Sequence, residues 1–293
     1  MSRRLLLLLS WTFLGLFSIL PLGIVLAIAL GRVADHVPPF YFGLETTNFA
    51  AVLGDPLYLQ ALWLSIRTAA LVTVICLVMG YPMALAIASA PPLWRGPLLL
   101  AMMLPFWTGF LMRINAWIGL LRDGGWVDTV LAVLGFAQTR LLYTDTALCI
   151  GMVYTYLPFM VLPVYARLAK LDRTLLEAAA DLGASPFRAF LRVTLPLSLP
   201  GIGAGVALVF IPSAGEYVIP DLLGGPGARL IGRVVWEEFF NNRDWPMAAA
   251  LTWVLLVALV LVPVAIRAAV NALQSSSFSI RRTRTSRLPT WFA

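Results

Sequence analysis

Six long apolar stretches dominate this chain and constrain what it can fold into. They cover residues 5–31, 59–88, 97–121, 145–168, 197–220 and 246–270, and each exceeds the roughly 20 residues that a helix needs to cross a bilayer. Hydrophobic residues make up 60% of the 293 residues and charged residues only 12%, whereas soluble domains hold about 45–50% and 25%. The sequence therefore predicts an all-α polytopic membrane protein with six transmembrane helices.

The charges beside these stretches predict which side each loop faces. If the N-terminus is cytoplasmic, the inner segments carry 13 basic and 3 acidic residues, and the outer segments carry 6 basic and 10 acidic residues. Because positive charge is enriched in cytoplasmic loops, both termini are expected inside. The net charge of +7 then reflects topology, and we expect no nucleic-acid partner.

One lysine and the basic tail complete the charge pattern. Lys170 is the only lysine, and no glycine-rich loop precedes it, so no P-loop nucleotide site is expected in this chain. The tail contains FSIRRTRTSR, a polybasic run that is typical of contact with anionic membrane lipid.

The inner loop over residues 170–201 is the longest predicted cytoplasmic connection. Asp172 is placed to cap a helix over residues 173–182. Gly183 suits the position after a helix end, where φ turns positive. The sequence therefore predicts a short helix that ends in a tight glycine turn.

A second short helix is predicted directly after this turn. Ser185 and Pro186 fit an N-cap followed by proline at the first helical position, with the helix ending near Val193. Pro196 and Pro200 are then expected to interrupt the chain before the next span. The small residues of the loop fit close docking of a partner or, equally, a surface helix without one; these are Ala178, Ala179, Ala180 and Ala184.

The loop resembles a motif of a known family. The inner-membrane subunits of bacterial ABC importers carry E-A-A-x3-G-x9-I-x-L-P, and this chain has Glu177-Ala178-Ala179, Gly183, then Val193-x-Leu195-Pro196. The resemblance implies the type I importer permease fold, and it implies that this loop is the coupling helix that binds an ATPase subunit. The coupling residues so implied are Glu177, Ala178, Ala179, Asp181, Gly183, Ala184 and Pro196.

A second stretch narrows the resemblance. Residues 215–246, which include EFFNNRDWP, are similar to polyamine importer permeases, most closely to the putrescine permeases of the PotH type. The resemblance implies a non-catalytic subunit of a putrescine or spermidine importer in the bacterial inner membrane. It also implies three partners: a second homologous permease subunit, a dimer of cytoplasmic ATPase subunits that holds ATP and Mg²⁺, and a periplasmic polyamine-binding protein.

This resemblance divides the chain into three expected parts. Residues 1–58 form an N-terminal transmembrane helix and an outer loop. The apolar run of this helix is longer than the 7–15 residues of a cleaved signal peptide, so we expect the helix to be retained. Residues 59–271 form the permease core of five helices, and residues 272–293 form a basic cytoplasmic tail.

Glu216 is an ionisable residue within an apolar span, and such residues usually line a bundle interior or a water-filled path. Pro212 and Gly215 should loosen the helix beside it. A cationic substrate needs a carboxylate on its route, which favours a substrate-path role. A structural ion pair with Arg113 or Arg67, at similar predicted depth, is the alternative.

Aromatic side chains could add cation–π attraction for an ammonium group. The candidates for the substrate path are Trp107, Tyr154, Tyr156 and Tyr217, together with Asp221 at the outer mouth. The spacing of Gly201 and Gly205 permits close helix approach, either within this chain or to another subunit.

Other functions remain as alternatives. A permease for a different small solute, or a transporter or channel that works alone, would also use six spans with charges inside the membrane. No HExxH or GxSxG motif and no pair of intramembrane carboxylates is present in the sequence, which argues against an intramembrane enzyme.

Overall fold

Helices account for nearly all of the regular structure. The computed structural model describes residues 3–135, 140–172 and 174–261. A two-stranded antiparallel sheet, β1 (Arg32–Val33) and β2 (Phe40–Tyr41), follows the first helix. The helices are α1 (Arg3–Ala29), α2 (Thr47–Gly54), α3 (Pro56–Ser89), α4 (Pro92–Trp107), α5 (Phe110–Leu121), α6 (Trp126–Val133), α7 (Asp145–Leu168), α8 (Thr174–Asp181), α9 (Pro186–Ala189), the π-helix η1 (Phe190–Thr194), α10 (Leu195–Ala214), α11 (Val218–Leu223), α12 (Ile231–Trp236), the π-helix η2 (Glu237–Asn241) and a last helix Trp245–Leu261.

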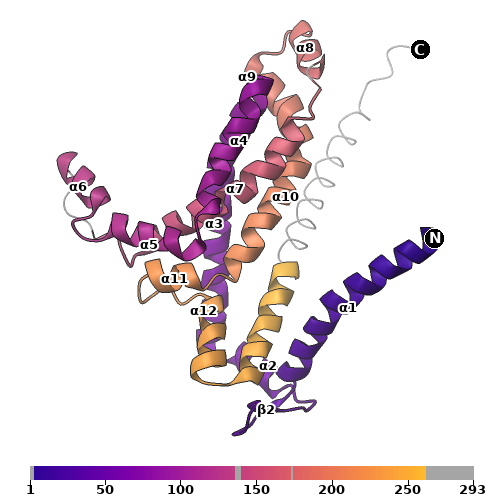
Figure 1. Cartoon of the computed structure of the whole chain (residues 1–293), viewed down its shortest axis with the longest axis vertical. Coiled ribbons are helices and arrows are strands. Elements are labelled where there is room, and N and C mark those ends of the chain that lie inside the picture. Colours follow the sequence, from indigo (N-terminus) through magenta and orange to yellow (C-terminus); the bar gives the residue numbers. More distant parts are fainter. Residues whose placement is uncertain (1–2, 136–139, 173, 262–293) are drawn as a thin grey trace, which may run out of the picture.

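Three of these helices, α3, α7 and α10, pack side by side and form the core (Figure 1). Small residues let them approach closely. A Cβ added to Gly205 of α10 would lie 2.7 Å from the Met160 sulfur of α7, and one added to Gly201 would lie 2.8 Å from the Pro163 carbonyl oxygen. The Gly201–Gly205 spacing therefore serves packing within this chain.

The described helices only partly reproduce the six predicted spans. Within the described residues, four helices are long and apolar enough to cross a membrane, or five if one bent pair counts as a single span. The predicted fourth span coincides with α7. The helix Trp245–Leu261 begins where the sixth span was predicted, but the second half of that prediction and the basic tail 272–293 lie outside the described residues.

The predicted third span, 97–121, is not one helix. It is divided between α4 and α5, and the chain bends by 86° between α4 and the segment Phe110–Val133, which begins with α5. Pro105 lacks an N–H in the last turn of α4, and Thr108 and Gly109 adopt extended backbone angles. The Thr108 hydroxyl donates to the Pro105 carbonyl at 2.7 Å and so satisfies one acceptor at the helix end. Local backbone chemistry therefore explains a break that hydropathy alone does not reveal.

The predicted chain break at Pro196 and Pro200 is also wrong. Helical structure continues from Pro186 to Ala214 through both prolines. The π-helix η1 lies directly before α10, and its wider turn changes the hydrogen-bond register just where Pro196 enters with no N–H to donate. The predicted cytoplasmic loop is thus joined to α10 by unbroken helix.

Two groups of elements lie at opposite ends of the molecule. Helices α8 and α9 lie at one end of the molecule, and α2, the β1–β2 hairpin and α12 lie at the other (Figure 1). Helix α1 leans away from the bundle, and only 6% of its apolar window is buried. Which end faces the cytoplasm stays a prediction from the charges.

Candidate functional site

A break between α10 and α11 places Glu216 at the centre of the candidate site. Helix α10 ends at Ala214, and α11 begins at Val218. In the break, one carboxylate oxygen of Glu216, Oε1, accepts the backbone N–H groups of Tyr217 at 3.1 Å, Val218 at 3.0 Å and Ile219 at 3.5 Å. These amides have no partner within their own helix, so the carboxylate caps α11.

The second carboxylate oxygen of Glu216 is held by a different helix. Tyr156 of α7 donates its hydroxyl hydrogen to Oε2 at 2.6 Å. The Tyr156 side chain is buried, with 5% of its surface exposed, while Glu216 is half-buried. A carboxylate has about four acceptor positions, so Oε2 keeps room for one more donor.

A row of aromatic rings links this break to the one between α4 and α5. The Tyr156 ring lies 6.3 Å from that of Phe159, and the Phe159 ring meets Phe106 of α4 edge-on at 5.2 Å. The Arg113 guanidinium lies over Phe106 at 4.8 Å and near Phe110 at 5.9 Å. Helix α11 also packs against both α5 and α7 (Figure 1), so the two breaks adjoin.

Arg113 does not neutralise Glu216. None of the ion pairs among the described residues includes Glu216, Arg113 or Arg67. Only 8% of the Arg113 side chain is exposed, and its buried Nε has no hydrogen-bond partner within the described part of the chain. The Glu216–arginine pair that the sequence left open is therefore not formed, and aromatic faces hold the guanidinium instead.

The remaining predicted path residues surround this centre to different degrees. Tyr217 is 43% exposed beside Glu216, and Asp221 of α11 lies 3.4 Å from the Arg233 guanidinium. Tyr154 packs edge-on against Trp117 at 5.3 Å. Trp107 ends α4 with 81% of its surface exposed. The structure thus gathers Glu216, Tyr156, Tyr217 and Asp221 around α11, and none of its described contacts joins Tyr154 or Trp107 to Glu216.

The predicted coupling loop has the expected local structure. The Asp172 carboxylate accepts the Thr174 N–H at 3.0 Å at the start of α8. Gly183 has φ +75°, and Ser185 accepts the Arg188 N–H at 3.4 Å at the start of α9. None of the described side chains of α8 is buried, and Leu182 is 88% exposed.

Within this loop the residues predicted to couple to an ATPase differ in exposure. Glu177, Ala178, Asp181 and Gly183 are exposed, while Ala179 and Ala184 are half-buried and joined by a 3.0 Å backbone hydrogen bond. Pro196 lies apart from them in the first turn of α10. A cavity of about 390 Å³ separates α8 from the ends of α3 and α7; it is lined by Leu85, Ala88, Ser89, Leu168, Leu171, Leu176, Glu177 and Thr194.

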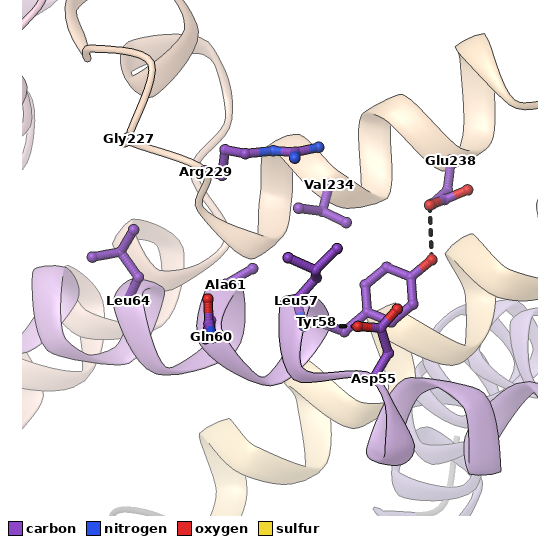
Figure 2. Close-up of a pocket in the computed structure, with 10 residues that line it drawn as sticks. All are labelled: Asp55, Leu57, Tyr58, Gln60, Ala61, Leu64, Gly227, Arg229, Val234 and Glu238. Atoms are coloured by element: carbon purple, nitrogen blue, oxygen red, sulfur yellow. Dashed lines mark hydrogen bonds between the residues drawn. The ribbon is translucent and has the colours of Figure 1, made fainter.

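A hollow at the opposite end of α3 was not predicted from the sequence. Figure 2 shows this hollow, of about 270 Å³, in which Tyr58 donates to Glu238 at 2.9 Å and Asp55 caps α3. Nearby, burial and the Glu238 charge raise the pKa of Asp244, against the lowering effect of the Met247 N–H. In the sequence, the pair Asp55-Pro56 could have indicated the start of α3, because proline is common at the first position of a helix.

The fold and the loop together define the membrane component of an ABC importer, and comparison with known proteins agrees. Residues 78–275 match the family described as "Binding-protein-dependent transport system inner membrane component", which covers more than half of the chain. The chain belongs to this family. It is therefore a multi-pass inner-membrane transport component and not an enzyme.

Several characterised proteins are similar to this chain. The spermidine/putrescine transport system permease protein PotB of Haemophilus influenzae is 41% identical over 254 residues, which are 86% of this chain and 87% of that protein. PotB of Escherichia coli K12 is 43% identical over 214 residues, 72% of this chain and 78% of that protein. A solved bacterial ABC transporter involved in the import of the acidic polysaccharide alginate matches with a TM-score of 0.66 and 17% identity, over 90% of this chain and 94% of that one. The last match supports the fold alone.

Proposed function

We propose that this chain is the permease subunit of an ATP-driven importer of spermidine or putrescine, and that it forms half of the translocation path. The observation that carries the proposal is the Glu216 carboxylate, which lies at a helix break and has no arginine or lysine paired with it among the described residues. The function of the PotB relatives supports the same substrate class.

The positive charge of a polyamine determines which side chains its path requires. Each ammonium group that enters a low-dielectric path needs compensation. Glu216 supplies one negative charge, and the exposed rings of Tyr217 and Trp107 offer cation–π faces. Tyr154 completes the aromatic set, and Asp221 attracts cations toward the mouth. Because a polyamine carries at least two positive charges, the companion permease supplies at least one further acid.

Energy enters through the loop around Gly183. The exposed α8 inserts into a cleft of one subunit of the ATPase dimer, which binds ATP and Mg²⁺. The contacting residues are Glu177, Ala178, Ala179, Asp181, Gly183 and Ala184, with Pro196 at the base of the loop. The helical segment Pro186–Ala214 joins this loop directly to the break that holds Glu216. A displacement of the loop is thereby carried along α10 to the substrate site.

Reconstitution tests the proposal. The chain would be placed in proteoliposomes with its companion permease, the ATPase and the polyamine-binding protein, and uptake of radiolabelled putrescine and spermidine measured. We expect uptake only with ATP and all partners, and competition between the two polyamines. Uptake by this chain alone, without ATP, would instead identify a secondary transporter. ATP-driven uptake of a different solute with no polyamine uptake would identify another permease.

Glu216→Gln tests the site within the same assay. The amide keeps the size of the side chain and an acceptor for α11 but removes the charge. Uptake should fall on the order of tenfold or more, by analogy with hydrogen bonds and pairs that involve a charged group, with normal assembly. Full uptake by this variant would exclude Glu216 from the path.

A further inference from the structure

We propose that Tyr156 is a positioning residue, which holds the Glu216 carboxylate in the orientation that receives a substrate ammonium group. The inference rests on the proposed function, since it concerns the same carboxylate. It gives Tyr156 a different role from the cation–π contact that the sequence suggested, because a side chain with 5% exposure presents no open ring face to a substrate.

The two oxygens of the Glu216 carboxylate have different hydrogen-bond partners. Oε1 accepts the N–H groups of Tyr217 and Val218 at 3.1 and 3.0 Å, and that of Ile219 at 3.5 Å, so its acceptor positions are filled by α11. Oε2 accepts only the Tyr156 hydroxyl among the described residues. The remaining position on Oε2 is therefore the one that an ammonium group can take.

The environment of Tyr156 keeps its hydroxyl in place. The ring is buried in the core formed by α3, α7 and α10 and packs beside Phe159, which in turn contacts Phe106. Close packing restricts the rotation of such a buried ring. The hydroxyl therefore defines the direction of Oε2, whereas α11 alone restrains only Oε1.

The choice of a neutral donor has a consequence for the charge of the site. An arginine at this position would orient Glu216 equally well but would cancel its negative charge. Arg113 is instead held over Phe106 and Phe110, away from any ion pair among the described residues. Tyr156 orients the carboxylate and leaves its charge for the substrate cation.

One carboxylate also serves both the substrate and α11. A cation that pulls on Oε2 acts on the same group that caps the first turn of α11 through Oε1. Substrate binding and the ordering of α11 are thereby linked, and α11 packs against the bent helix α5.

Three variants separate this role from a purely structural one. Tyr156→Phe removes the hydroxyl and keeps the ring. Glu216→Gln removes the charge and keeps a partner for the tyrosine. Tyr165→Phe is the matched control on the same helix, because the Tyr165 ring packs against the core and no described hydrogen bond involves its hydroxyl. Equilibrium binding of radiolabelled spermidine would be measured on the purified permease–ATPase complex in nanodiscs, without binding protein, per assembled complex.

The expected result is a Kd raised on the order of tenfold by Tyr156→Phe, the effect of losing one hydrogen bond to a charged group, and an unchanged Kd for Tyr165→Phe. Adding Tyr156→Phe to Glu216→Gln should raise the Kd no further, because the tyrosine acts through the charge. A wild-type Kd for Tyr156→Phe, or an additive loss in the double variant, would overturn the positioning role. A wild-type Kd for Glu216→Gln would overturn the proposed path itself.

Discussion

The contact between α7 and α10 gives a prediction whose size follows from the coordinates. A Cβ on Gly201 would lie 2.8 Å from the Pro163 carbonyl oxygen and 2.9 Å from the Arg167 Cβ, whereas a Cβ on Gly203 would meet nothing within 4 Å. To reach ordinary contact distance, the two helices must separate by roughly 0.5 Å in a close-packed interface. Overpacking of this kind costs about 1–3 kcal/mol.

Comparing the two glycines isolates this steric cost. Both lie in α10, so replacing either with alanine gains about 0.5–1 kcal/mol of helix propensity. Gly203→Ala should therefore be slightly stabilising, and Gly201→Ala less stable than it by about 1–3 kcal/mol. Unfolding of the purified variants by sodium dodecyl sulfate in mixed micelles, followed by tryptophan fluorescence, measures the difference. Equal stability of the two variants would refute the close contact between α7 and α10.

Three further predictions concern the loop, the topology and the outer end. Gly183→Val should lose co-purification with the ATPase, because φ +75° disfavours β-branched residues, while Gly183→Asn should retain it; equal binding by both would argue against the turn. In a cysteine-free background, an impermeant thiol reagent added to intact cells should label Gly227→Cys, which has open space, but not Leu182→Cys; labelling at 182 would reverse the topology. Burial raises the pKa of Asp244 in the folded protein above its ordinary value. The free energy of unfolding should therefore fall as the pH rises from the ordinary pKa of Asp244 through its raised pKa. Asp244→Asn should abolish that slope, and an unchanged slope would contradict the assignment.

Much of the local structure of the proposed coupling loop could be predicted because its signals are local. Asp172, Gly183 and Ser185 act on backbone groups one to five residues away, and each takes the predicted role. The same locality explains the error at Pro196. A proline is read as a helix breaker when only its own missing N–H is considered, whereas the π-helix before it accommodates the change.

The candidate site could be predicted only in part. An acid in an apolar stretch identified Glu216, and Pro212 and Gly215 indicated the break beside it. Its partner was not visible, because Tyr156 is 60 residues away in the chain and an aromatic residue in a span usually only packs. The hollow in which Tyr58 donates to Glu238 was not predicted for the same reason, because these two residues are 180 positions apart in the chain.

The sequence by itself determined that this chain is a helical membrane protein with a loop of two short helices around a glycine turn, because hydropathy, charge asymmetry and turn chemistry act over short distances along the chain. Only the tertiary structure decided that the chain bends by 86° between α4 and the segment Phe110–Val133, that Pro186–Ala214 is continuous, and that Glu216 pairs with a phenol and not with Arg113. These features depend on which distant helices pack together, and packing within the α3, α7 and α10 core selects one partner among several of equal depth.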